Sequence, residues 1–185
     1  MDILLYAFIA LVVIVLVYGV STYNGFVGSR NRVEEAFSTM DVYLIKRSDL
    51  IPNLVETVKG YAKHEKETLE NVIKARNSAL GANTLEDKVS AEKEVSSVLG
   101  RLFALAENYP DLKANTNFQE LMSQLKAVEE DIANARKYYN GVVRNFNTSV
   151  EVFPSNIVAG LFKFTKKPLF EVEDASQRQN VKVSF

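Results

Sequence analysis

The chain has 185 residues, a net charge of −1, no cysteine and no tryptophan. The near-neutral charge gives no electrostatic reason to expect a nucleic-acid partner, and the absence of cysteine excludes disulfides, thiolate metal sites and cysteine nucleophiles. Four prolines and eight glycines, most of them near candidate helix ends, are typical of a mostly helical protein.

The first predicted element is an uncharged stretch from Ile3 to Val20, in which every residue is apolar, glycine or tyrosine. A helix of this length extends about 27 Å, enough to cross the hydrocarbon core of a bilayer. The alternative is a cleaved signal peptide, but Met1 and Asp2 are not a basic n-region and no A-x-A-like cleavage site follows. The residues expected to span the membrane are Ile3, Leu4, Leu5, Phe8, Ile9, Leu11, Val12, Val13, Ile14, Val15, Leu16 and Val17.

The basic residues that flank this stretch predict its orientation. None precedes it, whereas Arg30, Arg32, Lys46 and Arg47 follow it. Lys and Arg near a membrane span favour the cytoplasmic side. We therefore expect a single-pass protein with its N-terminus outside and the large domain in the cytoplasm.

Apolar residues three or four apart continue the anchor as one helix to about Lys46. Pro52 is then expected in the first turn of a second helix, where its missing N–H costs nothing, with Ser48 or Asp49 as the cap. This second helix is expected to run to the glycine-containing break at 81–84.

A third helix is predicted over 85–106, and a long fourth helix begins near Thr116 and is stopped by Pro154. Thr116 and Gln119 form a capping box at its start. Apolar residues recur every seven positions along it, which is the a/d seam of a bundle or coiled-coil helix. The seam consists of Phe118, Leu125, Ile132, Tyr139, Phe146 and Phe153, with Leu121, Val128, Ala135 and Val142 three residues after the first four.

Four helices joined by short loops predict an all-α fold. An N-terminal transmembrane helix (1–23) continues into a long antiparallel up-and-down four-helix bundle (24–153), followed by an irregular C-terminal tail (154–185) with a short strand at 181–183. In this topology the fourth helix ends near the membrane. Aromatic and basic residues of the tail then suit a bilayer surface, or else the aromatics cover the open end of the bundle. The membrane-surface candidates are Phe162, Lys163, Phe164, Lys166, Lys167 and Phe170.

Homo-oligomerisation is expected because the fourth helix looks longer than its neighbours, so that part of its seam lacks a partner within the chain, and because it carries apolar residues beside its main stripe. The alternative is a wide core stripe, which is common in globular helices. The candidates for an intermolecular contact are Met122, Val143, Phe146, Val150 and Phe153.

No pattern of residues points to catalysis. His64 is the only histidine and is expected on a solvated helix face. No phosphate-cradling glycine loop occurs, and the Glu-x-x-His motif of di-iron bundles is missing. We therefore expect no enzyme, no catalytic residue, no cofactor and no metal.

Several stretches resemble the LemA family over the whole length from the anchor to the C-terminus. The most specific is Asp49-Leu50-Ile51-Pro52-Asn53-Leu54-Val55-Glu56-Thr57-Val58-Lys59-Gly60-Tyr61; others are Arg30-Asn31-Arg32-Val33, Tyr109-Pro110-Asp111-Leu112-Lys113-Ala114-Asn115 and Phe153-Pro154-Ser155-Asn156. The resemblance implies a bacterial single-span protein of the inner membrane with a long helical bundle. It implies no enzymatic role.

Two functions remain open at this point. The protein is either a self-assembling scaffold or membrane-organising element, or a membrane-tethered adaptor that presents a helical surface to a protein partner. The expected partners are the lipid bilayer, further copies of the chain and a protein of unknown identity, with no nucleic acid.

Overall fold

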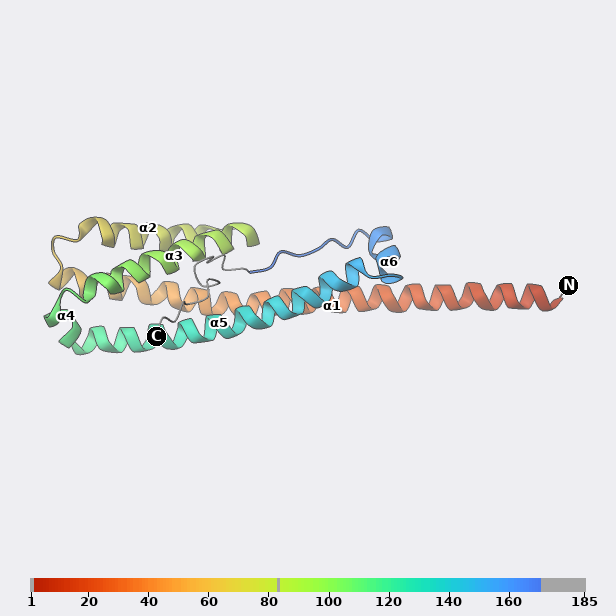
Figure 1. The fold of residues 1–185 in the computed structure, drawn as a ribbon, viewed down its shortest axis with the longest axis horizontal. Helices are drawn as coiled ribbons and strands as arrows, with labels where there is room; N and C mark the ends of the chain where they lie inside the picture. Colours follow the sequence, from red (N-terminus) through yellow and green to blue (C-terminus); the bar gives the residue numbers. More distant parts are fainter. Residues whose placement is uncertain (1, 83, 171–185) are drawn as a thin grey trace, which may run out of the picture. The chain divides into compact units, whose positions relative to one another are not determined.

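The structure is a computed structural model that describes residues 2–82 and 84–170. These residues form helices and connecting segments without a β-strand, which confirms the predicted all-α class (Figure 1). The predicted strand at 181–183 lies outside the described residues. The helices are α1 (Asp2–Tyr61), α2 (Lys66–Gly81), α3 (Leu85–Ala106), α4 (Pro110–Ala114), α5 (Thr116–Glu151) and α6 (Ser155–Leu161).

The described residues divide into two compact units. Unit 1 takes in residues up to 46 together with 127–169, and unit 2 takes in 47–126 and Phe170. Both α1 and α5 pass from one unit into the other. The domain limits expected at residues 23 and 153 stay predictions.

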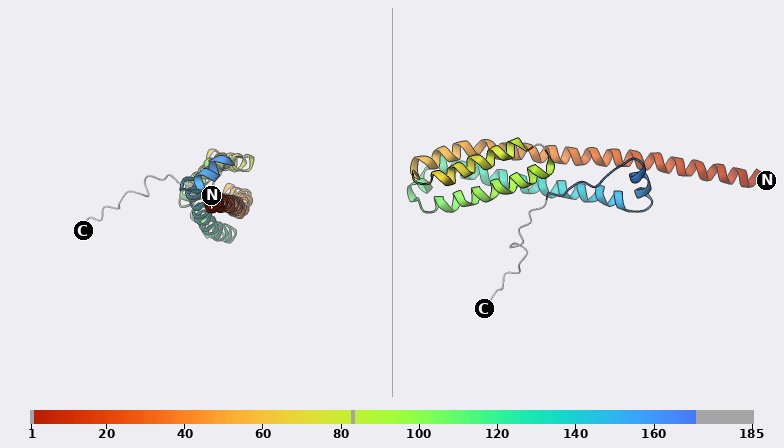
Figure 2. Two further views of the ribbon diagram at one scale, coloured as in Figure 1. Left: turned by 90° about the vertical axis from the view of Figure 1, so that its right-hand side faces the viewer. Right: turned by 90° about the horizontal axis from the view of Figure 1, so that it is seen from above.

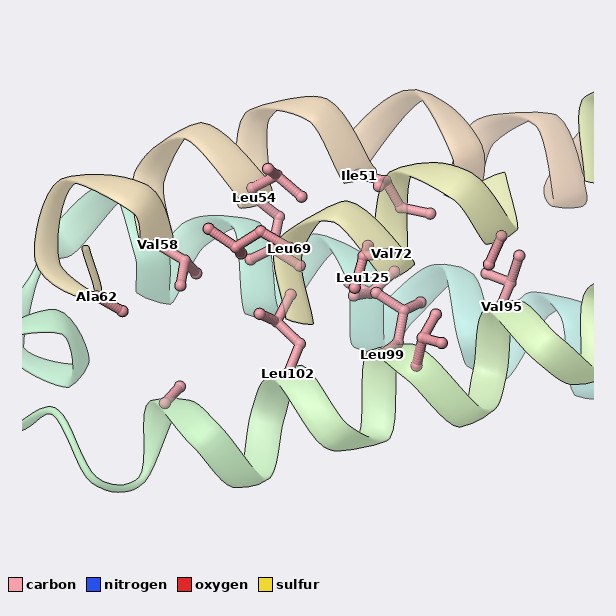
Figure 3. Close-up of a cluster of buried hydrophobic side chains, with 14 of the residues drawn as sticks. Ile51, Leu54, Val58, Ala62, Leu69, Val72, Val95, Leu99, Leu102 and Leu125 are labelled. Carbon is pink, nitrogen blue, oxygen red and sulfur yellow. The ribbon is translucent and has the colours of Figure 1, made fainter. Parts of the chain in front are cut away.

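Unit 2 has an apolar core to which α1, α2, α3, α4 and α5 all contribute (Figure 3). α2 and α3 lie side by side (Figures 1 and 2). Each long helix supplies residues three and four positions apart, as a helix with one apolar face must. Each fully buried leucine, isoleucine or valine adds about 1.5–3 kcal/mol to stability. The most deeply buried leucine, isoleucine and valine members are Ile51, Leu54, Val58, Val72, Val95, Leu102 and Leu112.

The break predicted between Lys46 and Pro52 is wrong, because α1 continues to Tyr61 with Pro52 inside it. Proline has no N–H, so the carbonyl oxygen of Ser48, four residues earlier, loses its helical donor. Arg76 on α2 donates from Nε to that oxygen at 2.7 Å. A side chain of another helix therefore replaces the missing backbone donor. The chain turns instead at 62–65, where His64 is exposed in the connection rather than on a helix face.

Side chains cap the starts of α3 and α5. Thr84 accepts a hydrogen bond from the Asp87 backbone N–H at 3.1 Å, which satisfies one free donor of the first turn of α3. At α5 the capping residue is Asn115, whose Oδ1 accepts from the Phe118 N–H at 2.9 Å. The capping box predicted from Thr116 and Gln119 is therefore wrong: the cap lies one residue earlier, and Phe118 at its third position has no polar side chain to complete a box.

In unit 1, α5 runs antiparallel to α1. The rings of Phe26 and Phe146 have centroids 6.1 Å apart, and those of Phe37 and Tyr139 are 6.0 Å apart. Residues with increasing numbers along α1 thus contact residues with decreasing numbers along α5. This is the pairing expected for the first and last long helices of an up-and-down arrangement.

The main seven-residue series of α5 is buried from Phe118 to Phe146, but the series three residues later does not keep its repeat to the end. In a straight α-helix, residues seven apart differ by about 20° in direction around the helix axis. After three or four heptads this drift approaches the angle between consecutive residues, so the residue that faces the core is the next one along the chain. Val143 is accordingly fully buried, while Val142 is only half-buried. Phe153 lies beyond the end of α5 and is 79 % exposed.

Candidate functional site

The first part of α1 is an uncovered apolar surface. Every residue from 2 to 18 is exposed, including all those expected to span the membrane. Within the part of the chain that the structure describes, α1 is the helix long and apolar enough to cross a bilayer. The arrangement is consistent with membrane anchoring.

The segment after α5 is turned back by α6. Helix α6 buries Val158 and Ala159 and ends at Leu161, and two residues later Lys163 lies in the left-handed region, at φ 58°. The Phe164 N–H donates to the Ala159 carbonyl at 2.9 Å, and the Lys163 N–H donates to that of Gly160 at 3.4 Å. This pair of bonds is a Schellman motif, which usually has glycine at the left-handed position. It reverses the chain and directs Phe164 toward α1.

Aromatic side chains dock this segment on α1 within unit 1. Phe164 stacks on Phe26 with centroids 4.8 Å apart and ring planes 17° apart. Phe162 lies against Tyr23, with centroids 4.6 Å apart. The Arg30 guanidinium is 6.0 Å from the centre of the Phe164 ring, within the range of a cation–π contact. The tail aromatics were predicted as candidates for a contact, but their partners on α1 were not predicted from the sequence.

Polar contacts fasten the rest of the segment to α5. Asn147 pairs with the backbone of Lys167 in both directions, each bond 2.8 Å long. The Tyr139 hydroxyl donates to the Pro168 carbonyl at 2.9 Å. Lys166 forms an ion pair with Glu151.

The membrane-surface candidates are therefore divided between buried or half-buried and exposed positions. Phe164 is half-buried against Phe26, and Phe170 is 1 % exposed. Phe162, Lys163 and Lys166 remain exposed. Within unit 1 the Phe164 ring therefore packs on α1, and contact of the remaining candidates with lipid stays a prediction.

The oligomer candidates are similarly divided. Val143 and Phe146 are buried in the chain, Val143 because the stripe shifts along α5 and Phe146 because it packs against Phe26, so neither is available for contact with another copy. Met122 packs partly buried against the core of unit 2, and Val150 is half-buried. Phe153 alone of the five is fully open to solvent.

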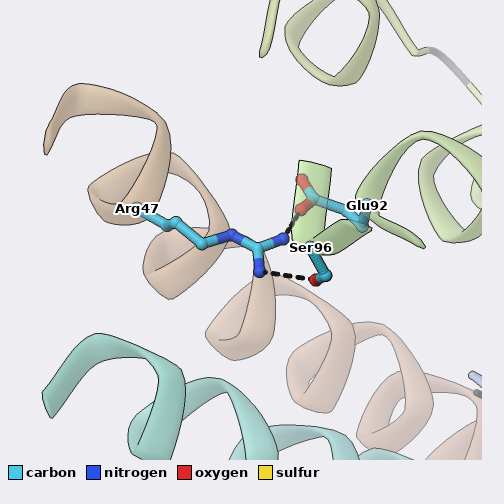
Figure 4. A network of polar contacts seen from close by, with 3 residues as sticks. All are labelled: Arg47, Glu92 and Ser96. Carbon is cyan, nitrogen blue, oxygen red and sulfur yellow. Dashed lines mark hydrogen bonds and ion pairs between the residues drawn. The ribbon is translucent and has the colours of Figure 1, made fainter. Parts of the chain in front are cut away.

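Unit 2 contains a buried charge cluster. Arg47 on α1, with a completely buried side chain, forms an ion pair with Glu92 on α3 and donates to Ser96 Oγ at 3.0 Å (Figure 4). The Glu92 side chain is 6 % exposed. Since a buried charge needs a compensating partner, this pair is expected to fix how α1 and α3 meet within unit 2. No local pattern reveals this pair, because both residues look like ordinary charged surface positions.

Tyr109, just before α4 in unit 2, has a shifted pKa. Partial burial raises the pKa of Tyr109, and the hydrogen bond that its hydroxyl donates to Glu65 Oε1 at 3.1 Å raises it further. Among residues 2–82 and 84–170, no group of three histidine, aspartate or glutamate side chains is placed to hold a metal ion.

A family model described as the LemA family matches residues 36–185. The chain belongs to the LemA family. The match begins inside α1, so it includes unit 2 and the α5 and α6 parts of unit 1, while the apolar stretch precedes it.

Curated relatives of this LemA-family chain are distant. Protein LemA of Metamycoplasma hominis is 24 % identical over 154 residues, which cover 82 % of this chain and 69 % of the relative. Magnetosome protein MamQ 2 of Paramagnetospirillum magneticum is 23 % identical over 179 residues, covering 83 % and 66 % respectively. MamQ of Magnetospirillum gryphiswaldense is 22 % identical over the same shares. The chain spans about two thirds of the length of these relatives.

Proposed function

We propose that this protein is a membrane-anchored helical scaffold without enzymatic activity, which self-associates at the bilayer. The observation that carries the proposal is the uncovered apolar stretch of α1, which continues as one helix into the folded units. The names of the LemA and MamQ relatives, which denote no enzyme, support the non-enzymatic part.

The continuity of α1 favours a permanent anchor over a cleaved signal peptide. Cleavage soon after Val20 would cut the helix beside Tyr23, whose ring contacts Phe162. It would also leave the buried Phe26 near a new, frayed helix end. A signal peptide is expected to leave the mature fold intact, so these contacts argue that the stretch is retained.

The proposed location is the inner membrane, with the N-terminus outside and both folded units in the cytoplasm, because Arg30 and Arg32 follow the span. Since the chain has no cysteine, Asp2→Cys and Ser78→Cys introduce single labels, and Ser78 is exposed. In intact spheroplasts an impermeant maleimide should label position 2 and not position 78. Labelling of 78 but not of 2 would reverse the proposed orientation.

Self-association is proposed because anchors held in one membrane raise the effective concentration of the attached units, so that weak contacts suffice. Mass measurement on the full-length protein in mild detergent and in nanodiscs should find several copies in one particle. A single copy in both environments would refute the scaffold.

A second candidate, the adaptor, is favoured by a groove in unit 2. The groove lies between α1 and α2, has a volume of about 930 Å³, and has Val55, Leu69 and Ile73 among its apolar residues. Its lining also has four lysines (Lys59, Lys63, Lys66 and Lys74) and two glutamates (Glu56 and Glu70). Lys59 pairs with Glu56 at 3.2 Å and Lys66 with Glu70 at 3.6 Å, which leaves a net positive rim.

The occupant that fits an apolar groove with a basic rim is an acidic amphipathic helix of a partner protein. A photo-crosslinking residue at Ile73 of the full-length protein should give an adduct whose mapped site is an acidic helical segment. Lys63→Glu with Lys74→Glu should abolish the adduct, whereas the matched change Lys93→Glu with Lys126→Glu, at exposed positions that do not line the groove, should not. Equal loss in both variants, or an adduct in a basic segment, would exclude this partner.

A further inference from the structure

The turn from α5 into α6 is unusually apolar for an exposed segment. Residues 152–162 contain no charged side chain. Within them, Val152, Phe153, Ile157, Leu161 and Phe162 are 48 %, 79 %, 62 %, 74 % and 51 % exposed; we name these five the α6 patch. Outside this patch, the large hydrophobic residues exposed beyond Val20 in the described chain are Tyr23, the neighbouring pair Val42 and Ile45, and the separate residues Tyr61, Leu80 and Tyr138. Scattered ones are normal on a protein surface, but a gathered set marks an interaction site.

Helix α6 carries apolar residues on both its inward and its outward face. Its inward face buries Val158 and Ala159, while Ile157 and Leu161, four residues apart and so on one face, point outward. A short helix in water would expose polar side chains here. Backbone bonds from Asn156 to Val152 and from Ile157 to Pro154 hold the preceding turn in place. The outward apolar face is therefore fixed by the fold.

The contact between Phe162 and Tyr23 fixes where this patch lies along the α1 axis, relative to the apolar stretch. Both residues belong to unit 1. Tyr23 lies three residues beyond Val20, which is about 4.5 Å along the helix axis. The headgroup layer on each side of a bilayer is several ångströms thick. If α1 spans the membrane as proposed, Tyr23 and the Phe162 ring against it lie in that layer.

We propose that the α6 patch is a second membrane contact, whose outward side chains enter the headgroup and upper acyl region of the bilayer that α1 crosses. The inference rests on the proposed anchoring of α1. Side chains of this kind suit that depth, because an interfacial helix buries its apolar face about 5–10 Å into the boundary. Two attachment points, one spanning and one interfacial, would hold unit 1 against the membrane.

The contact is apolar rather than electrostatic in origin. Of the tail lysines, Lys166 is paired with Glu151, and Lys167 is half-buried with its backbone bound to Asn147. Only the exposed Lys163 directly follows the patch. Binding should therefore depend little on the charge of the lipid or on salt, unlike attachment through a basic cluster.

The absence of tryptophan makes a direct test available, because each introduced tryptophan is the only one in the chain. Leu161→Trp and Ile157→Trp report on the patch, and both positions are exposed, so the fold should tolerate them. The full-length variants are reconstituted into zwitterionic vesicles with or without brominated lipid. We expect blue-shifted emission and strong quenching, greater with bromines near the headgroups than with bromines near the chain ends. Neither added salt nor anionic lipid should change the quenching.

Two controls separate this inference from the anchoring itself. Tyr18→Trp lies in the apolar stretch and should be quenched if α1 is in the bilayer. Tyr138→Trp replaces another exposed aromatic of unit 1, next to the Tyr139 that contacts Phe37, and should not be quenched. Position 37 is about 25 Å beyond Val20 along the helix.

Each outcome decides one claim. Quenching at 18 without quenching at 157 and 161 overturns the second contact but leaves the anchor. No quenching at 18 overturns the anchoring. Blue-shifted but unquenched emission at 161 means that protein, such as a second copy, covers the patch, and quenching only in anionic lipid at low salt means that lysines carry the contact. Either result also overturns the proposal.

Discussion

Replacing Glu92 by leucine should destabilise unit 2 strongly. The Arg47 guanidinium is completely buried and Glu92 is its ion-pair partner, so the variant leaves a desolvated positive charge without that carboxylate. Breaking a buried pair from one side costs about 3–5 kcal/mol. Folded domains are typically stable by only about 5–15 kcal/mol, so the loss should be plain in a denaturation curve.

Further variants separate the contributions of charge, hydrogen bonding and packing in the Arg47–Glu92 pair. Glu92→Gln keeps an acceptor for the guanidinium but removes the charge, so its loss should be smaller than that of Glu92→Leu. The double variant Arg47→Met with Glu92→Leu removes both charges and fills the space with apolar atoms. It should recover most of the stability, because a well-packed apolar pair is often no worse than a buried ion pair. An exposed comparison is Glu56→Ala, which breaks the surface pair with Lys59 and should cost at most about 1 kcal/mol.

The assay is urea denaturation of the full-length protein in detergent, followed by far-UV circular dichroism. If Glu92→Leu falls within about 1 kcal/mol of the native protein, like a surface pair, the charge is not buried as described. If the double variant is no more stable than Glu92→Leu, lost packing rather than the uncompensated charge explains the effect.

Three further predictions concern single contacts. Arg76→Met should lower the free energy of unfolding by about 1.5–3 kcal/mol, because it removes a charged donor from the Ser48 carbonyl. Pro52→Ala in the Arg76→Met background should restore much of this free energy, because alanine returns the helical N–H. If urea denaturation shows that Pro52→Ala has the same effect with and without Arg76, the two residues are not linked through Ser48. Lys163→Gly should raise stability by about 1 kcal/mol and Lys163→Val should lower it, since Lys163 has φ 58°; equal melting curves would contradict the left-handed turn. Because the pKa of Tyr109 is raised in the folded state, its protonated form stabilises the fold below the ordinary value of 10.0, and this contribution is lost as pH rises through the higher folded pKa. Stability measured across alkaline pH should therefore fall more steeply for the native protein than for Tyr109→Phe, and parallel curves would rule out the effect.

The amino-acid sequence was sufficient for features that depend on local order. An uncharged stretch long enough to cross a bilayer is visible without any partner, and so is the repeat that makes α5 a helix with one buried side. The end of α3 at Ala106 and the stop of α5 before Pro154 follow from nearby proline and capping chemistry. Family membership was also visible, because the motif around Pro52 is a contiguous run of residues.

Tertiary contacts decided the features that the sequence missed. Pro52 predicts a helix start only as long as no outside group satisfies the Ser48 carbonyl, and Arg76 is distant in sequence. Likewise, nothing local distinguishes Arg47 and Glu92 from surface charges until α1 and α3 bring them together. The same applies to Phe164, whose partner Phe26 precedes it by more than a hundred residues.

The tail shows this division most clearly. Its composition identified a segment rich in aromatic and apolar side chains, but composition does not say which of them face inward. The Schellman turn at Lys163 sends Phe164 onto α1, while α6 leaves Ile157 and Leu161 outside. Sequence determines which side chains are able to leave water, because that is a property of each residue. The fold determines which of them have already done so within the chain, because burial requires a partner at short distance.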